Sequence, residues 1–288
     1  MSILSVRGLV KNYGATQALR EVDLEVPAGS IFGLLGPNGS GKTTLLGIVL
    51  DILVATRGSF QWGPGLKRGS LLETPNFYPY LTGRENLQIV AELRGRGGEG
   101  LSRALETVGL DSYEAMTFSK YSLGMKQRLA IGATLIGDPE VVVLDEPTNG
   151  LDPAGIADVR ELIRGLRQGG KTVLLASHML DEVEKVCTHV AILKKGKVLS
   201  QGALEEVLCD EDRLELRSDD LEALQRLLES HPLNPKVSRV GGLLNVVLEA
   251  GALKPAELNR YCLEGGQSLS HLVLRKKTLE SHFLEVTD

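Results

Sequence analysis

The sequence has few cysteines and no apolar run long enough to cross a bilayer. Its three cysteines, Cys187, Cys209 and Cys262, are far apart and odd in number, which argues against a disulfide framework or a zinc site and is typical of reduced thiols in a cytosolic protein. The most apolar stretch, residues 45–55, is interrupted by Asp51 and is shorter than the roughly 20 residues of a membrane-spanning helix. The chain opens without a basic segment followed by an apolar core, so we expect no secretory signal. If the protein works at a membrane, we expect it to do so through a partner.

An excess of basic residues is also absent. The chain has 32 Lys and Arg against 37 Asp and Glu, a net charge of -5, which argues against a protein that holds nucleic acid through a basic face. Hydrophobic residues make up 42% and charged residues 24%, so a disordered or fibrous class is not favoured. The 288 residues suffice for a domain of about 200 residues with a smaller one attached.

Short apolar strands alternate with helices in the part of the chain up to residue 208. Residues 30–35 are predicted to form a buried strand that enters a Gly-rich loop, and residues 43–50 follow as a helix. Residues 141–144 and 171–176 are mostly apolar runs, typical of strands buried on both faces of a parallel sheet. Further strands are predicted at 3–9 and 22–26, and a hairpin at 190–193 and 197–199 around Lys195-Gly196. The pattern predicts an α/β fold.

The composition changes near residue 210, where an acidic segment follows a predicted helix at 203–208. The predicted elements beyond it are strands at 213–217, 235–240, 243–249 and 269–275, and helices at 219–229, 255–262 and 278–286. Their order predicts a small α+β module. We therefore predict a first domain at 1–208 and an accessory domain at 211–288, in which we find no motif tied to chemistry.

A phosphate-binding loop is predicted at residues 36–43, which fit G-x-x-x-x-G-K-[ST] between an apolar strand and a helix. Small residues let backbone N–H groups point at phosphates, and the helix N-terminus adds partial positive charge. We expect Lys42 to reach the β- and γ-phosphates and the Thr43 hydroxyl to hold Mg²⁺. The predicted nucleotide contacts in this loop are Gly36, Pro37, Asn38, Gly39, Ser40, Gly41, Lys42, Thr43 and Thr44.

Two acids, Asp145 and Glu146, end the apolar strand at 141–144. Alone, two acids after a strand fit a solvated turn equally well. Together with the phosphate loop, the position predicts that Asp145 binds Mg²⁺ and that Glu146 accepts a proton from an attacking water.

Four further segments resemble the ATPase domain of the ABC family. The first, Tyr121-Ser122-Leu123-Gly124-Met125-Lys126-Gln127-Arg128, is similar to the family signature, with Leu and Met in place of a Gly and a Gln. The second, Asn149-Gly150-Leu151-Asp152, is similar to the D-loop. His178 matches the switch histidine, and Tyr13 matches the aromatic residue that stacks on adenine. The resemblance covers about residues 1–208. It implies a P-loop NTPase fold with an inserted helical subdomain at about 74–138.

In that family two ATPase domains meet head to tail, so the resemblance implies a homodimer. Ser122 and Gly124, with Asp152 nearby, would then contact ATP held by the other copy. His178 would donate a hydrogen bond to developing charge on the γ-phosphate, and Tyr13 would offer a flat ring to the base. Each residue also has a simpler explanation: Ser122 as a helix N-cap, His178 as a structural histidine and Tyr13 as packing.

One departure from the family pattern is Glu73, where the family usually has a Gln that touches Mg²⁺ and water and links the site to the membrane partner. A carboxylate can still hold a cation, although it adds negative charge beside Asp145 and Glu146. Glu73 is therefore predicted as a catalytic and metal-contacting residue, with a solvated glutamate as the alternative. The stretch 73–87 resembles the branch of bacitracin- and lantibiotic-resistance exporters.

The predicted function is that of an ATP-hydrolysing subunit with ATP and Mg²⁺ as cofactors, dimerising on ATP to drive a separate transmembrane permease from the cytoplasmic face. By analogy the cargo is an exported peptide antibiotic, lipid or drug. We expect the region of residues 73–94 to contact the membrane partner. One alternative is a soluble ABC ATPase acting on the ribosome or nucleic acid, which the single ATPase domain and the lack of a coiled coil or basic stripe disfavour. The other is a non-catalytic nucleotide-binding regulator, which the presence of Lys42, Asp145, Glu146 and His178 disfavours.

Overall fold

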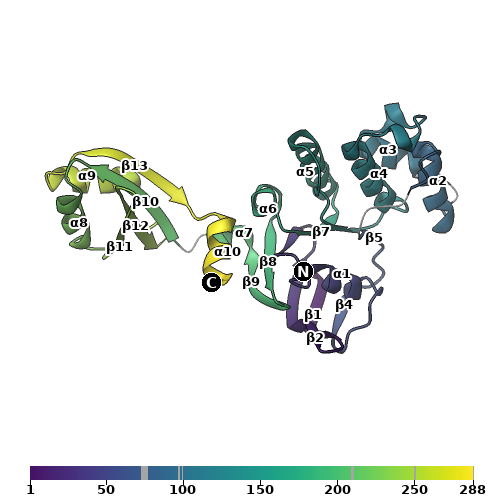
Figure 1. The fold of residues 1–288 in the computed structure, drawn as a ribbon, viewed down its shortest axis with the longest axis horizontal. Helices are drawn as coiled ribbons and strands as arrows, with labels where there is room; N and C mark the ends of the chain where they lie inside the picture. Colours follow the sequence, from purple (N-terminus) through teal and green to yellow (C-terminus); the bar gives the residue numbers. More distant parts are fainter. Residues whose placement is uncertain (73–76, 97, 99, 209–210, 250, 288) are drawn as a thin grey trace. The chain divides into compact units, whose positions relative to one another are not determined.

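The computed structural model describes residues 1–72, 77–96, 98, 100–208, 211–249 and 251–287. Residues 1–203 and 204–286 form separate units, coloured from purple to green and from green to yellow in Figure 1. Each unit has its own apolar core. Among the described residues, no helix combines the length and apolar character needed to cross a membrane.

A six-stranded sheet organises the first unit, in the order β5-β6-β7-β3-β8-β9. Its central strands are parallel and buried on both faces, because nearly every residue in them is apolar. The strands are β3 (Ile31–Leu35), β5 (Arg68–Leu71), β6 (Val141–Asp145), β7 (Thr172–Ser177), β8 (His189–Lys194) and the antiparallel β9 (Lys197–Ala203). The predicted α/β fold with a parallel sheet is confirmed.

The register of this sheet brings distant segments to one edge. Leu35 at the end of β3 pairs with Ser177 at the end of β7, and Asp145 at the end of β6 pairs with Ala176. The carboxyl ends of parallel strands are where open α/β sheets bind ligands. The helices of the core that follow these strands are α1 (Lys42–Val49), α5 (Pro153–Gln168) and α6 (Leu180–Val186).

The predicted hairpin is confirmed as β8 and β9. Lys195 and Gly196 both have positive φ, 48° and 79°, which matches the tight two-residue turns that suit twisted antiparallel strands. Glycine is required at 196, since a Cβ there would lie 2.5 Å from the carbonyl oxygen of Ala18. The Gly196 N–H donates to the carbonyl of Ser40 at 2.9 Å, so the hairpin turn supports the loop after β3.

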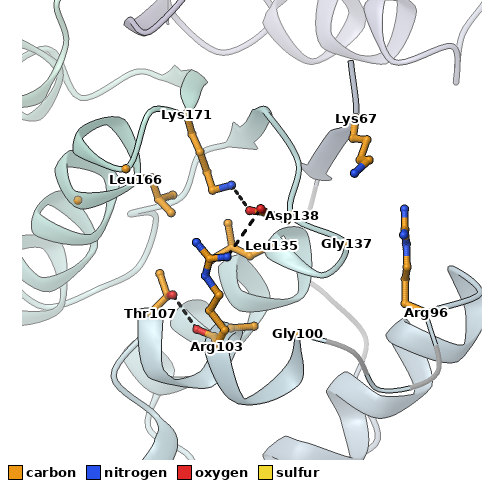
Figure 2. A pocket seen from close by; sticks show the side chains of 13 residues that line it. Lys67, Arg96, Gly100, Arg103, Thr107, Leu135, Gly137, Asp138, Leu166 and Lys171 are labelled. Carbon is orange, nitrogen blue, oxygen red and sulfur yellow. Dashed lines mark hydrogen bonds and ion pairs between the residues drawn. The ribbon is translucent and has the colours of Figure 1, made fainter. Parts of the chain in front are cut away.

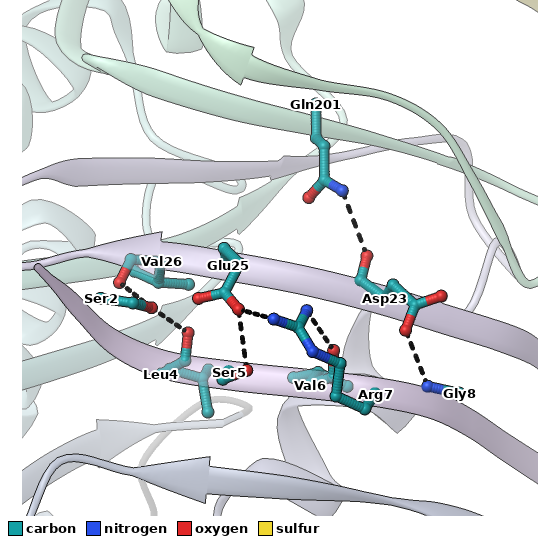
Figure 3. A network of polar contacts seen from close by, with 10 residues as sticks. All are labelled: Ser2, Leu4, Ser5, Val6, Arg7, Gly8, Asp23, Glu25, Val26 and Gln201. Carbon is teal, nitrogen blue, oxygen red and sulfur yellow. Dashed lines mark hydrogen bonds and ion pairs between the residues drawn. The ribbon is translucent and has the colours of Figure 1, made fainter.

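A second, antiparallel sheet of the first unit has the order β2-β1-β4. Its strands are β1 (Ser2–Tyr13), β2 (Thr16–Pro27) and β4 (Arg57–Trp62). Polar side chains hold its edge, as Figure 3 shows: the Ser5 hydroxyl donates to Glu25 at 2.8 Å, and Arg7 pairs with the same carboxylate. Gln201 of β9 donates to the carbonyl of Asp23 at 3.4 Å, which ties this sheet to the central one.

Helices between β5 and β6 form a subdomain with an apolar cluster of its own. They are α2 (Gly83–Leu93), α3 (Leu101–Thr107) and α4 (Leu123–Leu135), and Leu87, Leu105 and Leu129 are fully buried members of the cluster. A capping box between Thr82 and Glu85 starts α2 by satisfying N–H groups that the helix leaves free.

The second unit contains a four-stranded antiparallel sheet in the order β11-β12-β10-β13. Its elements are α7 (Leu204–Leu208), β10 (Glu211–Ser218), α8 (Leu221–Glu229), β11 (Lys236–Val240), β12 (Leu243–Glu249), α9 (Pro255–Glu264), β13 (Leu269–Lys276) and α10 (Leu279–Thr287). Alternate residues of β10 and β12, such as Leu216 and Val246, are fully buried and pack in one cluster with Leu224 of α8 and Leu258 of α9. The predicted sequence of strands and helices is confirmed, and it has the βαββαβ connectivity of ferredoxin-like modules.

Truncating a buried leucine of this core should destabilise the second unit selectively. Leu216→Ala removes a side chain with no exposed area and should cost about 2–5 kcal/mol, because the surrounding core collapses only partly around the cavity. Hydrogen exchange with mass spectrometry would report this as faster exchange in β10 and β12. Leu263→Ala on α9, where the side chain is 66% exposed, is the matched control and should leave exchange unchanged; equal effects of both substitutions would contradict the assigned core.

Candidate functional site

The loop between β3 and α1 has a backbone shape that glycine alone permits at two positions. Gly36 has φ 153° and Gly41 has φ 109°. A Cβ at Gly36 would lie 2.2 Å from the carbonyl oxygen of Leu193, and one at Gly41 would lie 2.8 Å from that of Ala18. The loop is therefore packed closely from behind, which fits a cradle that wraps phosphates with its backbone.

Lys42 begins α1, and its side chain is only 6% exposed. Its ammonium donates to the carbonyl oxygens of Gly36 at 2.7 Å and Pro37 at 3.3 Å. It also lies 3.7 Å from a carboxylate oxygen of Glu146. The cation is thus held against the loop, where phosphate oxygens would meet it.

Thr43 and Asp145 come together from different elements. The Thr43 hydroxyl, on the first turn of α1, donates to the Asp145 carboxylate at the end of β6 at 2.7 Å. A hydroxyl and a carboxylate side by side are oxygen ligands of the kind that Mg²⁺ prefers.

Glu146 and His178 form a second contact at the same edge of the sheet. His178 Nδ1 lies 2.8 Å from Glu146 Oε2. Glu146 adopts a left-handed backbone with φ 48°, a costly conformation for a residue with a side chain. Its N–H donates to the carbonyl of Ala176 on β7 at 2.9 Å, which fixes the backbone there. The contacts of Lys42, Thr43, Asp145, Glu146 and His178 therefore link these predicted residues into one group.

The predicted residues of the signature and D-loop form a separate group. Ser122 caps α4 by accepting from the Met125 N–H at 3.2 Å, and Asp152 caps α5 by accepting from the Gly155 N–H at 3.0 Å. Ser122, Gly124 and Asp152 line one hollow of about 450 Å³ whose lining contains no residue of the loop at 36–43. One chain thus presents two separate groups of predicted site residues.

Two predicted residues stand outside both groups. Tyr13 ends β1 with 48% of its area exposed, and the Lys11 ammonium lies 4.9 Å from the centre of its ring. Glu73 lies outside the described residues, so its predicted catalytic and metal role stays a prediction.

The sequence analysis gave no role to two charged residues of the second hollow, Arg128, which it named only as the end of the signature segment, and Asp158. Arg128 lies four residues after Gly124 on α4, a spacing that places both on one helix face, so helical periodicity could have indicated it. Its guanidinium donates to the carbonyls of Val108 at 3.3 Å and Gly109 at 3.4 Å, which orients the side chain. Asp158 lies in the second turn of α5, beyond the D-loop motif that drew attention to Asp152.

Comparisons with known proteins agree with this geometry. The model of the family described as ABC transporter matches residues 19–149. The bacitracin transport ATP-binding protein BcrA of Enterococcus faecalis is 41% identical over 71% of this chain and 70% of its own length. The protein of the same name from Bacillus licheniformis is 33% identical over 99% of this chain and 97% of its own length.

A solved structure resembles the first unit. The cbiO1 protein of Clostridium perfringens, described as part of the ABC transporter complex cbiONQ, superposes with a TM-score of 0.66 and 27% identity, over 72% of this chain and 90% of its own. The phosphate loop, the signature, the acidic strand end and the D-loop follow one another in this order along the chain. This chain therefore belongs to the ATP-binding proteins of ABC transporters, a family that binds and hydrolyses ATP.

Proposed function

We propose that this chain is the ATP-driven motor of an exporter and that two copies complete each ATP site together. The observation that carries this proposal is the division of the site residues into two groups. One group holds Lys42, Thr43, Asp145, Glu146 and His178, and the other lines a hollow of its own. A symmetric pair of chains can bring the first group of each copy to the second group of its partner.

The first group of residues would hydrolyse ATP by accepting a proton from water and by stabilising the negative charge of the phosphates. A carboxylate oxygen of Glu146 accepts a proton from the water that attacks the γ-phosphorus, while the bond from that phosphorus to the β–γ bridging oxygen breaks and ADP leaves. Lys42 moves from the loop carbonyls to phosphate oxygens and balances the charge that spreads over them. One ring N–H of His178 would donate to the γ-phosphate, and the Nδ1 of the same ring lies 2.8 Å from Glu146 Oε2 before ATP binds.

Mg²⁺ fits the pair formed by Thr43 and Asp145. Their oxygens lie 2.7 Å apart, and a hydroxyl plus one carboxylate is a sufficient protein share for an ion that keeps waters and phosphates as its other ligands. When bound, the ion neutralises charge on the β- and γ-phosphates. Glu73 is a third proposed ligand.

The second copy would contribute the N-terminus of α4. Ser122 has its hydroxyl at the cap of this 13-residue helix, and the Gly124 N–H lies in the first turn. Both suit the γ-phosphate, since helix N-termini bind anions. Tyr13, with 48% of its area exposed, would stack on the adenine of the ATP held by its own chain.

A separate transmembrane permease is the proposed membrane partner, with this chain on the cytoplasmic face. Tyr78, Tyr80 and Leu93 are 48%, 70% and 83% exposed, and such apolar side chains suit a protein interface. The resemblance to bacitracin transport proteins over nearly the whole chain supports export, with a peptide antibiotic, lipid or drug as cargo. The same resemblance disfavours a role on the ribosome or on nucleic acid.

Neutralising the proposed base should stop turnover without preventing ATP binding. Glu146→Gln keeps the size of the side chain but cannot accept the proton, so kcat should fall by about a hundredfold to ten-thousandfold. ATP should then hold two chains together, which size-exclusion chromatography with and without ATP would detect. Glu106→Gln, on the exposed surface of α3, is the matched control. Rapid phosphate release by Glu146→Gln would overturn the assigned role.

A mixing experiment would test whether each site is shared between chains. Lys42→Ala disables the phosphate loop, and Ser122→Asp keeps a side chain able to cap α4 but places a negative charge where the γ-phosphate would bind. Each variant alone should be inactive, whereas an equimolar mixture should regain part of the ATPase activity, because a mixed dimer has one intact shared site. Ser122→Asn, a neutral cap, should retain more activity than Ser122→Asp. No recovery on mixing, with both variants folded, would contradict the shared site.

The transport role predicts a membrane partner. Affinity purification of the tagged chain from mildly solubilised native membranes should recover a polytopic membrane protein in stoichiometric amount, identified by mass spectrometry. Recovery with ribosomes, or of the chain alone, would overturn the transport role and leave the ATPase assignment intact.

A further inference from the structure

A basic hollow lies at the end of the central sheet opposite to the ATP site. Lys67 precedes β5 and Lys171 precedes β7, at the amino ends of these parallel strands, whereas Asp145 and His178 lie at or beyond the carboxyl ends. The hollow has a volume of about 490 Å³, a size typical of small-molecule sites. No residue of either proposed nucleotide group lines it.

The hollow has two walls that come from different parts of the first unit. Arg96, Arg103 and Asp138 belong to the helical subdomain and the turn after α4, while Lys67 and Lys171 belong to the sheet core. Figure 2 shows these side chains around a common space. A ligand in this space would contact both walls at once.

Asp138 is the acid among the lining residues, and its carboxylate forms ion pairs with two cations. Lys171 Nζ donates to Asp138 Oδ1 at 2.6 Å, and Arg103 Nη1 lies 3.7 Å from Oδ2. The hydrogen bond from Lys171 is the main cause that lowers the pKa of Asp138, so this acid is charged throughout the physiological range. Lys171 also donates to the carbonyl of Pro139 at 2.7 Å.

The turn that presents Asp138 is held in an uncommon conformation. Gly137 and Asp138 follow each other with φ 89° and 51°, and the Asp138 N–H donates to the carbonyl of Leu135 at 3.0 Å. A left-handed residue with a side chain costs free energy and persists where the surroundings fix it. Here it places the carboxylate in hydrogen-bond contact with Lys171 and near Arg103.

Lys67 of the sheet wall and Arg96 of the helical wall also line the space, and Figure 2 draws no polar contact for either. Within the described ranges, neither side chain has a hydrogen bond or ion pair. Glu140 lies beside Lys67 and accepts from its backbone N–H at 2.8 Å, but it does not line the hollow. Even with Glu140 included, four cations face two acids, in a chain whose net charge is -5.

We propose that this hollow binds a phosphate group with two negative charges, carried by a soluble phosphorylated compound or by a lipid headgroup. Lys67 and Arg96 supply the principal contacts, and Arg103 supplies a third. Arginine suits this ligand because its planar fork donates two hydrogen bonds to phosphate oxygens. The bound anion would tie the helical subdomain to the core, at a place separate from ATP.

The binding test uses the full chain with Lys42→Ala, which weakens phosphate binding at the loop of residues 36–43. Inorganic pyrophosphate is titrated while NMR follows the amide resonances of Gly137 and Gly169, which line the hollow. We expect saturable shifts at both glycines. Adding Lys67→Gln with Arg96→Gln should weaken binding about tenfold or more, as expected when charge-assisted hydrogen bonds are lost.

The matched control replaces two exposed arginines of the second unit, Arg239→Gln with Arg260→Gln, and removes the same total charge. It should bind pyrophosphate like its parent. Shifts confined to the loop of residues 36–43, or equal weakening in the control and the Lys67/Arg96 variant, would overturn the proposal.

A second arm distinguishes the two sources of phosphate. The same proteins are sedimented with phosphatidylcholine vesicles that contain or lack phosphatidic acid. Sedimentation that needs phosphatidic acid together with Lys67 and Arg96 assigns the hollow to a lipid headgroup. Pyrophosphate binding without such sedimentation assigns it to a soluble compound, and failure of both probes to respond to the Lys67/Arg96 substitutions overturns the site.

Discussion

The loop of residues 36–41 keeps its shape because two other segments press against its main chain. The Gly196 N–H donates to the carbonyl of Ser40 at 2.9 Å, and the carbonyl of Gly196 accepts from the Arg20 N–H at 2.8 Å. The carbonyl of Ala18 closes the space behind Gly41. The antiparallel sheet and the β8–β9 hairpin thus pack against the phosphate loop and fix its backbone conformation. The position of Lys42 over that loop depends on this packing.

Features of this arrangement that depend on a few neighbouring residues could be predicted from the sequence. The apolar strand that ends in Asp145 and Glu146, the loop before Lys42, and the Lys195-Gly196 turn each carry their structural cause within a few neighbouring residues. For the same reason the order of strands and helices beyond residue 210 was predicted correctly, because alternation and turn residues mark each element locally.

Features that depend on distant packing could not be predicted in the same way. The strands β4 (Arg57–Trp62) and β5 (Arg68–Leu71) carry polar residues and no long apolar run, so their place is set by the strands beside them. The basic hollow joins Lys67 to Lys171 across more than a hundred residues. No local spacing in the sequence predicts such a cluster, because Lys67 and Lys171 come together only when β5 and β7 take their places in the sheet.

At Glu146 the proposed catalytic role and the conformational preference of the backbone favour different residues. Its φ of 48° belongs to a region that glycine or asparagine enters at much lower cost. A search for more stable variants of this protein would therefore favour those residues at position 146 and would discard the carboxylate. The chain thus gives up part of its folding free energy to keep the proposed base beside Lys42 and His178, which is the trade between stability and activity that enzymes often make.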